Sequence, residues 1–181
     1  PVSLYAETKI AVETALLETR RDGFVPVCLR FATVFGVSPR MRFDLTVNHF
    51  TMEMMARKHL VVFGEQFWRP YIHVQDMARA VCLVLEASPE QVGNDVFNVG
   101  ADEQNYRKLD IIEMIKPFAP TAQAEYVHKD EDPRDYRVTF AKIRQRLNFR
   151  TTRTVTDGIR EVAALVESGV LRDLDDPVYR N

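Results

Sequence analysis

The sequence lacks several features that would place it in a narrow class of protein. It has only two cysteines, Cys28 and Cys82, each within an apolar run, so we expect buried free thiols in a reducing, cytoplasmic compartment. No apolar run approaches the ~20 residues that span a bilayer, and the formal net charge is only −2. We therefore expect no membrane and no nucleic-acid partner. No cluster of His, Cys, Asp and Glu has metal-ligand spacing, so no metal site is expected.

The beginning of the chain also lacks familiar signals. It opens on Pro1-Val2-Ser3, without an initiator Met and without the charged and apolar regions of a signal peptide. We expect from this a fragment or a processed chain. The length of 181 residues suits one domain, or one and a fraction.

Tyr5 and Lys9 are the most informative pair in the chain. Ser3 is expected to cap an amphipathic helix that runs to about Arg21. Residues i and i+4 share one helix face, so the phenol and the ammonium point into the same space. A free phenol titrates near pH 10 and is a poor base at neutral pH, whereas an adjacent cation favours its ionised form. This spacing also arises by chance, and a solvated pair on an exposed helix is the alternative interpretation.

Apolar runs and helical periodicity alternate along the rest of the chain, which predicts an α/β fold without internal repeats. Val81, Val84 and Leu85 are expected to form the apolar stripe of one helix. Strands are predicted at residues 25–31, 59–63, 71–74, 95–99 and 124–127. Helices are predicted at residues 44–58, 75–87, 106–115, 140–147 and 155–166, followed by a polar tail at 173–181.

Five stretches, in this order, resemble the C-terminal part of extended short-chain dehydrogenases/reductases, and more narrowly the NAD-dependent epimerase/dehydratase family. The first matches the Ser-x-Tyr-x-x-(Ser/Thr)-Lys helix of that family with Ser3, Tyr5, Thr8 and Lys9. One such stretch is a weak signal, whereas five in order at ordinary spacing are a strong one. They are residues 3–9, 29–36, 69–80, 97–100 and 132–137, the last followed by Lys142 and by Leu147-Asn148-Phe149.

The resemblance implies the C-terminal part of a Rossmann-like, doubly wound parallel sheet with a small α+β substrate-binding subdomain. Residues 1–40 and 68–100 would belong to the Rossmann-like domain, and residues 41–67 and 101–172 to the subdomain, followed by the tail at 173–181. The family's Gly-x-x-Gly-x-x-Gly turn, which holds the cofactor pyrophosphate, does not occur in the sequence. The resemblance thus implies about half of an enzyme, inactive alone, which needs its N-terminal Rossmann half and forms a homodimer.

The same resemblance implies a set of site residues. Tyr5 would be the general base or acid at a sugar hydroxyl, and Lys9 would assist it and bind the ribose of NAD or NADP. Thr33 and Val34 would lie beside the nicotinamide, although the family usually has Asn where Thr33 stands and often Gly where Asn148 stands. The residues that would contact a nucleotide-diphosphate sugar are Thr33, Asn48, Arg69, Asp132 and Arg134.

The implied reaction is modification of a nucleotide sugar by transient hydride transfer to bound NAD(P), and epimerisation is favoured. A 4,6-dehydratase, a decarboxylase or a reductase of the same family remains open, because the distinguishing residues lie upstream. Arg69 and Arg134 suit phosphate groups, which argues against a reductase of a small neutral ketone. A non-catalytic cofactor-binding sensor or scaffold is the alternative of another class, and the intact Tyr5 and Lys9 argue against it.

His73 and Asp76 resemble a catalytic pair, but a structural interpretation is favoured for both. His73 alternates with Ile72 and Val74 in a buried strand, and Asp76 is expected to cap the helix that follows.

Overall fold

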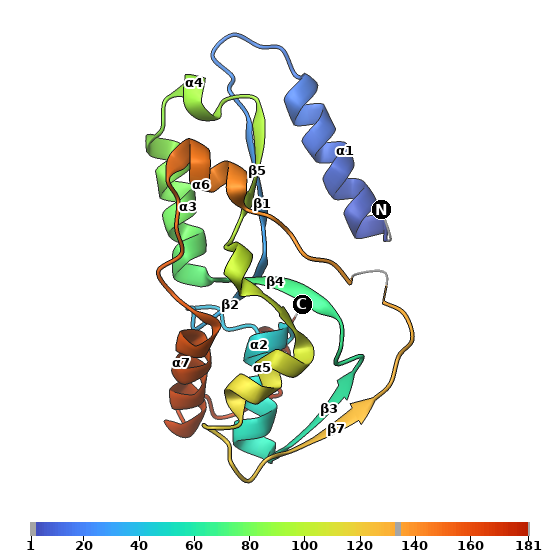
Figure 1. Cartoon of the computed structure of the whole chain (residues 1–181). Helices are drawn as coiled ribbons and strands as arrows, with labels where there is room; N and C mark the ends of the chain where they lie inside the picture. Colours follow the sequence, from blue (N-terminus) through green and yellow to red (C-terminus); the bar gives the residue numbers. More distant parts are fainter. Residues whose placement is uncertain (1–2, 133–134, 181) are drawn as a thin grey trace.

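The computed structural model describes residues 3–132 and 135–180, and its strands form three small sheets (Figure 1). In the first sheet, β1 (Val27–Phe31) pairs in parallel with β5 (Asp95–Val99). In another, β3 (His59–Phe63) pairs in parallel with β7 (Gln123–Val127). Parallel pairs with intervening helices are typical of α/β proteins, and the predicted fold class is confirmed.

The central sheet has three strands and connects the two ends of the molecule (Figure 1). β2 (Thr33–Phe35) pairs in parallel with β4 (Trp68–His73). The start of β4 pairs in antiparallel fashion with β6 (Asn105–Arg107). β4 therefore begins in the part of the molecule near β3 and ends beside the helix that follows it.

The helices begin and end close to the predicted positions. α2 continues directly into a π-helical turn, η1, and together they match the helix predicted at 44–58. The two other short helical turns, η2 and η3, are 3-10 helices. The helices are α1 (Leu4–Glu18), α2 (Thr46–Met52), η1 (Glu53–Arg57), α3 (Val74–Glu86), α4 (Pro89–Val92), η2 (Asp102–Gln104), α5 (Lys108–Ile115), α6 (Ala141–Leu147), α7 (Val155–Glu167) and η3 (Pro177–Tyr179).

The buried hydrophobic residues of the described chain form two large clusters. One lies among β1, β5, α3 and α6. The other lies among α2, α5, α7 and β3. The first cluster contains Ala32, Ile72, Ala80, Val84, Val92, Phe97, Val99, Phe140, Ile143 and Phe149, and the second includes Val47, Met54, Leu60, Val62, Tyr71, Ile111, Ile112, Ile115, Val155 and Ile159.

The segment predicted as a polar tail packs against the second half of the molecule. The Phe43 N–H donates to the Tyr179 carbonyl at 2.9 Å, and the two rings meet edge to face with centroids 5.7 Å apart. Leu171 and Leu174 contact the same small cluster, which contains Met52. Apolar residues spaced between the charges of this segment therefore attach it to α2 and α7.

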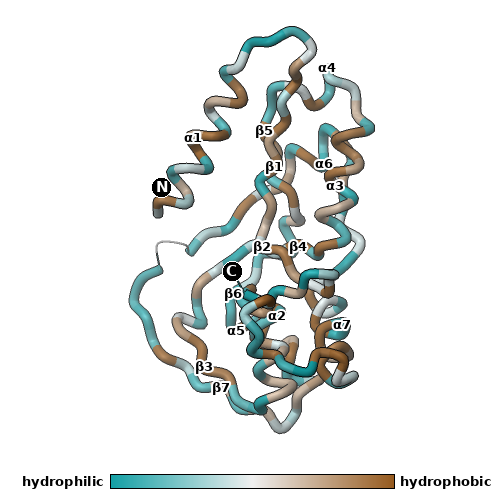
Figure 2. The backbone as a smooth tube through the Cα atoms, turned by 180° about the vertical axis from the view of Figure 1, so that it is seen from behind, coloured by the Kyte–Doolittle hydropathy of each residue, from teal (hydrophilic) through white to brown (hydrophobic). Residues whose placement is uncertain are grey.

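α1 differs from its prediction, because it is not amphipathic. None of its residues is buried, and it stands apart from the rest of the chain (Figures 1 and 2). Hydrophobic residues recur around it: Tyr5 and Val12 lie on one side, and Ile10 lies about 150° away around the axis. Glu13 reaches back to the sheet, where its Oε2 accepts from Nε of Arg30 at 2.8 Å.

Two further predictions about burial are wrong. Leu85 was expected in the apolar stripe of α3, but it is 79% exposed, because Asp76, Ala80 and Val84, at i, i+4 and i+8, form the buried face. Cys82 was expected to be buried, but it lies on the exposed side of the same helix. Leu85 instead lines an open apolar groove between β1 and α3.

Candidate active site

Tyr5 and Lys9 lie on the same side of the first turns of α1. The Nζ atom of Lys9 is 5.4 Å from the centre of the Tyr5 ring, and Tyr5 is 71% exposed. The helix begins just before them because Oγ of Ser3 accepts from the backbone N–H of Ala6 at 3.2 Å. The predicted phenol and cation therefore share one accessible surface.

Thr33 and Val34 lie in β2, where they pair with Tyr71 and Ile72 of β4. Both are partly buried, and the strand ends before Gly36, whose φ of 105° requires glycine. Burial raises the pKa of Tyr71 to about 12, so this neighbouring phenol is protonated at neutral pH and cannot serve as a base. Figures 1 and 2 show that α1 stands apart from β2.

Asn48 lies inside the molecule, where only 2% of it is exposed. Its Oδ1 accepts from the Gly36 N–H at 2.9 Å, and its Nδ2 donates to the Arg42 carbonyl at 3.0 Å. The side-chain amide is thus engaged with the loop between β2 and α2. In this arrangement Asn48 holds the backbone at the end of β2. Its contact with substrate stays a prediction.

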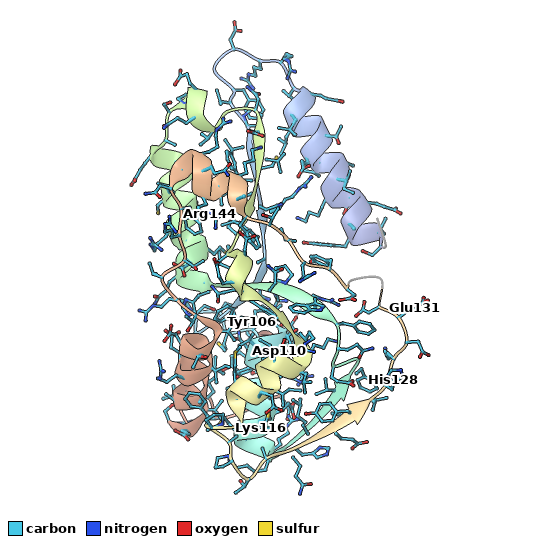
Figure 3. All side chains as sticks on the ribbon, in the orientation of Figure 1. Tyr106, Asp110, Lys116, His128, Glu131 and Arg144 are labelled. Atoms are coloured by element: carbon cyan, nitrogen blue, oxygen red, sulfur yellow. The ribbon has the colours of Figure 1, made fainter. Side chains whose placement is uncertain are left out.

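Arg69 and Asp132 form a largely enclosed ion pair at the beginning of β4. Nη2 of Arg69 lies 2.8 Å from the Asp132 carboxylate, and Nη1 donates to the Trp68 carbonyl at 2.6 Å. The Tyr136 ring lies 5.8 Å from the guanidinium, and Tyr106 is the cross-strand partner of Arg69 (Figure 3). Arg134, the second predicted phosphate contact, lies outside the described residues.

The backbone of residue 68 also holds the segment that carries Asp132. The Trp68 N–H donates to Oδ1 of Asp135 at 2.7 Å, and the Tyr136 N–H donates to the Trp68 carbonyl at 3.4 Å. Two guanidinium groups lie near the indole ring, those of Arg107 at 5.8 Å and Arg137 at 5.0 Å from its centre. His128 and Glu131 lie on the outer side of this segment (Figure 3). The described part of the segment thus brings the Arg137 guanidinium and the largely enclosed Asp132 carboxylate to the start of β4.

His73 and Asp76 both have structural roles: His73 ends the buried strand β4, as predicted, but the helix cap is His73 and not Asp76. His73 caps α3, because its Nδ1 accepts from the Gln75 N–H at 3.2 Å. Asp76 lies inside the first turn with no exposed surface, and it accepts from the backbone N–H groups of Thr152 and Arg153 at 2.9 Å each. The cap prediction for Asp76 is wrong because its partners lie 76 residues further along the chain, beyond the reach of local patterns.

Sequence reasoning also missed Glu161. This α7 residue lies with its Oε2 2.9 Å from Nε2 of His73, which is completely buried. Eighty-eight positions separate the two residues, so no spacing rule could have paired them. Within residues 3–132 and 135–180, no group of three or more His, Cys, Asp or Glu residues could hold a metal ion. In the same part of the chain, no helix is long and apolar enough to cross a membrane.

Comparison with known proteins gives curated relatives and solved structures of similar fold. UDP-glucose 4-epimerase from Bacillus subtilis (strain 168) is 27% identical over 183 residues, which cover 88% of this chain and 52% of the relative. The structure of RMD from Pseudomonas aeruginosa, complexed with NADPH, has a TM-score of 0.80 at 20% identity, covering 94% of this chain and 58% of that one. UDP-glucuronic acid 4-epimerase from Bacillus cereus, in complex with UDP-glucuronic acid and NAD, has a TM-score of 0.78 at 24% identity, covering 93% and 54%.

These matches agree in extent and in fold. The chain spans about half the length of the relatives that it matches. The structural likenesses show a Rossmann-like fold. The family model for the NAD dependent epimerase/dehydratase family matches residues 1–100, which is more than half of the chain. The chain therefore belongs to the NAD dependent epimerase/dehydratase family.

Proposed function

We propose that this chain is the substrate-side half of a nucleotide-sugar epimerase that works by transient hydride transfer to bound NAD or NADP. The observation that carries the proposal is the pair on α1, with Nζ of Lys9 5.4 Å from the Tyr5 ring centre. An exposed phenol beside a cation can remove a proton from a sugar hydroxyl during its oxidation and return it afterwards. Membership of the family supports this role.

The described residues fit a nicotinamide cofactor. Tyr5 and Lys9 would face its ribose, and Thr33 and Val34 would face its ring from the carboxyl end of β2, where ligands of parallel sheets collect. When bound, the nicotinamide ring accepts hydride from the sugar carbon and returns it.

Arg69 is the proposed contact for the substrate diphosphate. A guanidinium donates two parallel hydrogen bonds to phosphate oxygens, and this one is held in place by Asp132 and by the Trp68 carbonyl. Asp132 and Arg134 are proposed to bind the ribose or phosphate, and Asn48 of α2 is proposed to contact the substrate diphosphate. Structures of similar fold are described as complexes with UDP-glucose and UDP-glucuronic acid, which supports a nucleotide sugar as the ligand.

Epimerisation is our choice among the reactions of the family, because a curated relative is a UDP-glucose 4-epimerase. A dehydratase remains the second candidate, since an NDP-hexosamine 5,6-dehydratase has a TM-score of 0.78 to this chain. Decarboxylation and reduction require the same tyrosine and lysine. Products formed from several nucleotide sugars, separated by chromatography, distinguish these reactions directly.

The proposed partners are the N-terminal Rossmann half of the same protein and a second copy. β1 pairs only with β5 among the described strands, and an apolar groove of about 390 Å³ lies beside it, lined by Val27, Leu29 and Leu85. α1 is apolar on more than one side yet has no buried residue, and a helix of this kind needs cover on both sides. An adjoining parallel strand and helix would cover the groove, and a second α1 would cover the outer side.

The test uses the longer protein that includes the cofactor-binding half. Denaturation should release a nicotinamide dinucleotide, and Tyr5→Phe should reduce kcat by about a hundredfold or more. Tyr126→Phe, an exposed tyrosine on β7, is the matched control and should leave kcat unchanged. Unchanged turnover in Tyr5→Phe would remove the catalytic assignment, and absence of any bound or binding dinucleotide would remove the function.

A further inference from the structure

The His73 imidazole occupies a closed slot at the end of β4. It has no exposed surface, and its Nδ1 accepts from the Gln75 N–H at 3.2 Å. In the neutral ring, Nδ1 therefore carries no proton, and the proton resides on Nε2. Nε2 lies 2.9 Å from Oε2 of Glu161, so it donates to this carboxylate. One ring nitrogen thus caps α3 while the other is joined to α7.

The same ring supports the backbone that follows β2. A Cβ atom at Gly36 would lie only 2.4 Å from Nε2 of His73, so the glycine backbone rests against the ring edge. On the other side, Oδ1 of Asn48 accepts from the Gly36 N–H at 2.9 Å. The backbone at position 36 is therefore held between an imidazole and an amide, one from β4 and one from α2.

α7 comes close enough to join this arrangement because Gly158 lacks a side chain. A Cβ atom there would lie 2.4 Å from the Phe35 ring. Phe35 meets the His73 ring edge to face, with centroids 5.3 Å apart and an angle of 78°. Glu161 lies three residues after Gly158 on the same helix face. The close approach of α7 at Gly158 thus brings the Glu161 carboxylate to His73.

We propose that His73 and Glu161 are positioning residues that fix the backbone of residues 33–36, so that α7 sets the geometry of the proposed nicotinamide site. This inference rests on the proposed function, which puts Thr33 and Val34 beside the cofactor ring. β2 forms only three residue pairs with β4, so the ladder alone holds this strand end weakly. The Asn48 hydrogen bond to Gly36 and the packing of Gly36 against the His73 ring supply the remaining restraint. The proposed diphosphate contact, Arg69, lies at the opposite end of β4.

The experiment compares substitutions on α7 in the protein that includes its cofactor-binding half. Glu161→Ala should lower kcat by about tenfold to a hundredfold, because small misplacements of reacting groups are costly, with KM for the nucleotide sugar within about twofold. Glu161→Gln keeps the size and an acceptor oxygen, so it should restore most of kcat. His73→Asn keeps an acceptor near Nδ1 but cannot reach Glu161, so it should resemble Glu161→Ala. Glu167→Ala, at the end of the same helix, is the matched control.

A second readout separates this inference from the proposed function. Amide exchange at Gly36, followed by NMR in the same variants, should accelerate by about tenfold in Glu161→Ala and stay unchanged in Glu167→Ala. If the unsubstituted protein turns over no nucleotide sugar, the proposed function fails. The rate of amide exchange at Gly36 then decides by itself whether His73 and Glu161 hold this backbone. Unchanged exchange at Gly36 overturns the positioning role. A lower Tm in Glu161→Ala with unaltered kcat overturns it as well.

Discussion

The guanidinium of Arg69 and the carboxylate of Asp132 lie 2.8 Å apart, and their side chains are only 11% and 8% exposed. The pair joins the beginning of β4 to a segment 63 residues further along the chain. In such an enclosed position, removal of one partner leaves the other charge desolvated and unbalanced. The carboxylate therefore holds the guanidinium extended at the place where we propose a diphosphate binds.

The first prediction concerns this guanidinium. In the protein with its cofactor-binding half, Arg69→Gln should weaken UDP binding by about tenfold to a hundredfold, because charge-assisted hydrogen bonds to phosphate are lost. Titration calorimetry with UDP measures the change. Arg107→Gln is the control, since this guanidinium also lies near Trp68 but is paired with Asp110 and more exposed. Equal losses of UDP affinity in both variants would mean that positive charge in general, and not a specific contact from Arg69, supports binding.

The second prediction concerns α1 in the 181-residue chain on its own. A helix of 15 residues without buried contacts is only marginally stable in water. Its backbone amides should exchange with solvent within seconds, whereas those of α5, whose Ile111, Ile112 and Ile115 are completely buried, should be protected. Hydrogen exchange with mass spectrometry compares the two helices. Slow amide exchange along α1 in a monomeric sample would contradict the proposal that α1 needs a partner segment or a second copy packed against it.

The third prediction concerns Asp76, whose carboxylate accepts from Thr152 and Arg153 of the loop before α7 and from Nη1 of Arg79 at 2.6 Å. Asp76→Ala should lower the free energy of unfolding by about 3 kcal/mol or more, because two backbone N–H groups lose their buried partner. Urea denaturation measures the loss. Asp157→Ala, at an exposed carboxylate of α7, should cost clearly less. A similar loss of unfolding free energy in both variants would mean that burial of the Asp76 carboxylate adds nothing to the stabilisation by its hydrogen bonds.

The elements with strong local signals were predictable from the sequence. The strands at 59–63 and 95–99 were predicted with their observed bounds, because apolar runs bounded by turn residues identify strands. The resemblance of residues 3–9 to the family helix identified Tyr5 and Lys9, which the structure places side by side. Asn148, which stands where the family often has glycine, adopts φ of 50° and ends α6 in the left-handed conformation.

The remaining features depend on contacts between distant segments. The partners of Asp76 and His73 lie 76 to 88 residues away, and burial of Asn48 depends on the path of the loop that it holds. Local patterns carry no information on such contacts, so a helix cap was assigned to the wrong residue of the pair. The sequence also predicts an amphipathic α1, whereas its apolar residues lie on more than one side of the helix and no described residue of α1 is buried.

The last prediction concerns acid stability at the beginning of α7. The backbone N–H of Thr154 donates to Asp157 at 2.9 Å, and this bond, with those from the Thr154 hydroxyl and Arg160, lowers the pKa of Asp157 to about 2. Because the folded pKa lies below the ordinary value of 3.8, the stabilisation is complete above about pH 4 and is lost as pH falls toward 2. Asp157→Asn should therefore cost about 1 kcal/mol or less at pH 7.

That cost should shrink as pH falls from 4 toward 2, because the native carboxyl group then becomes neutral as well. Urea midpoints of the native protein and of Asp157→Asn, taken in parallel at several pH values, measure the difference. Glu167→Gln is the control, since this exposed carboxyl at the end of α7 should give no comparable pH-dependent difference. A difference for Asp157→Asn that stays constant between pH 7 and about pH 2.5 would mean that its charge contributes nothing beyond its hydrogen bonds.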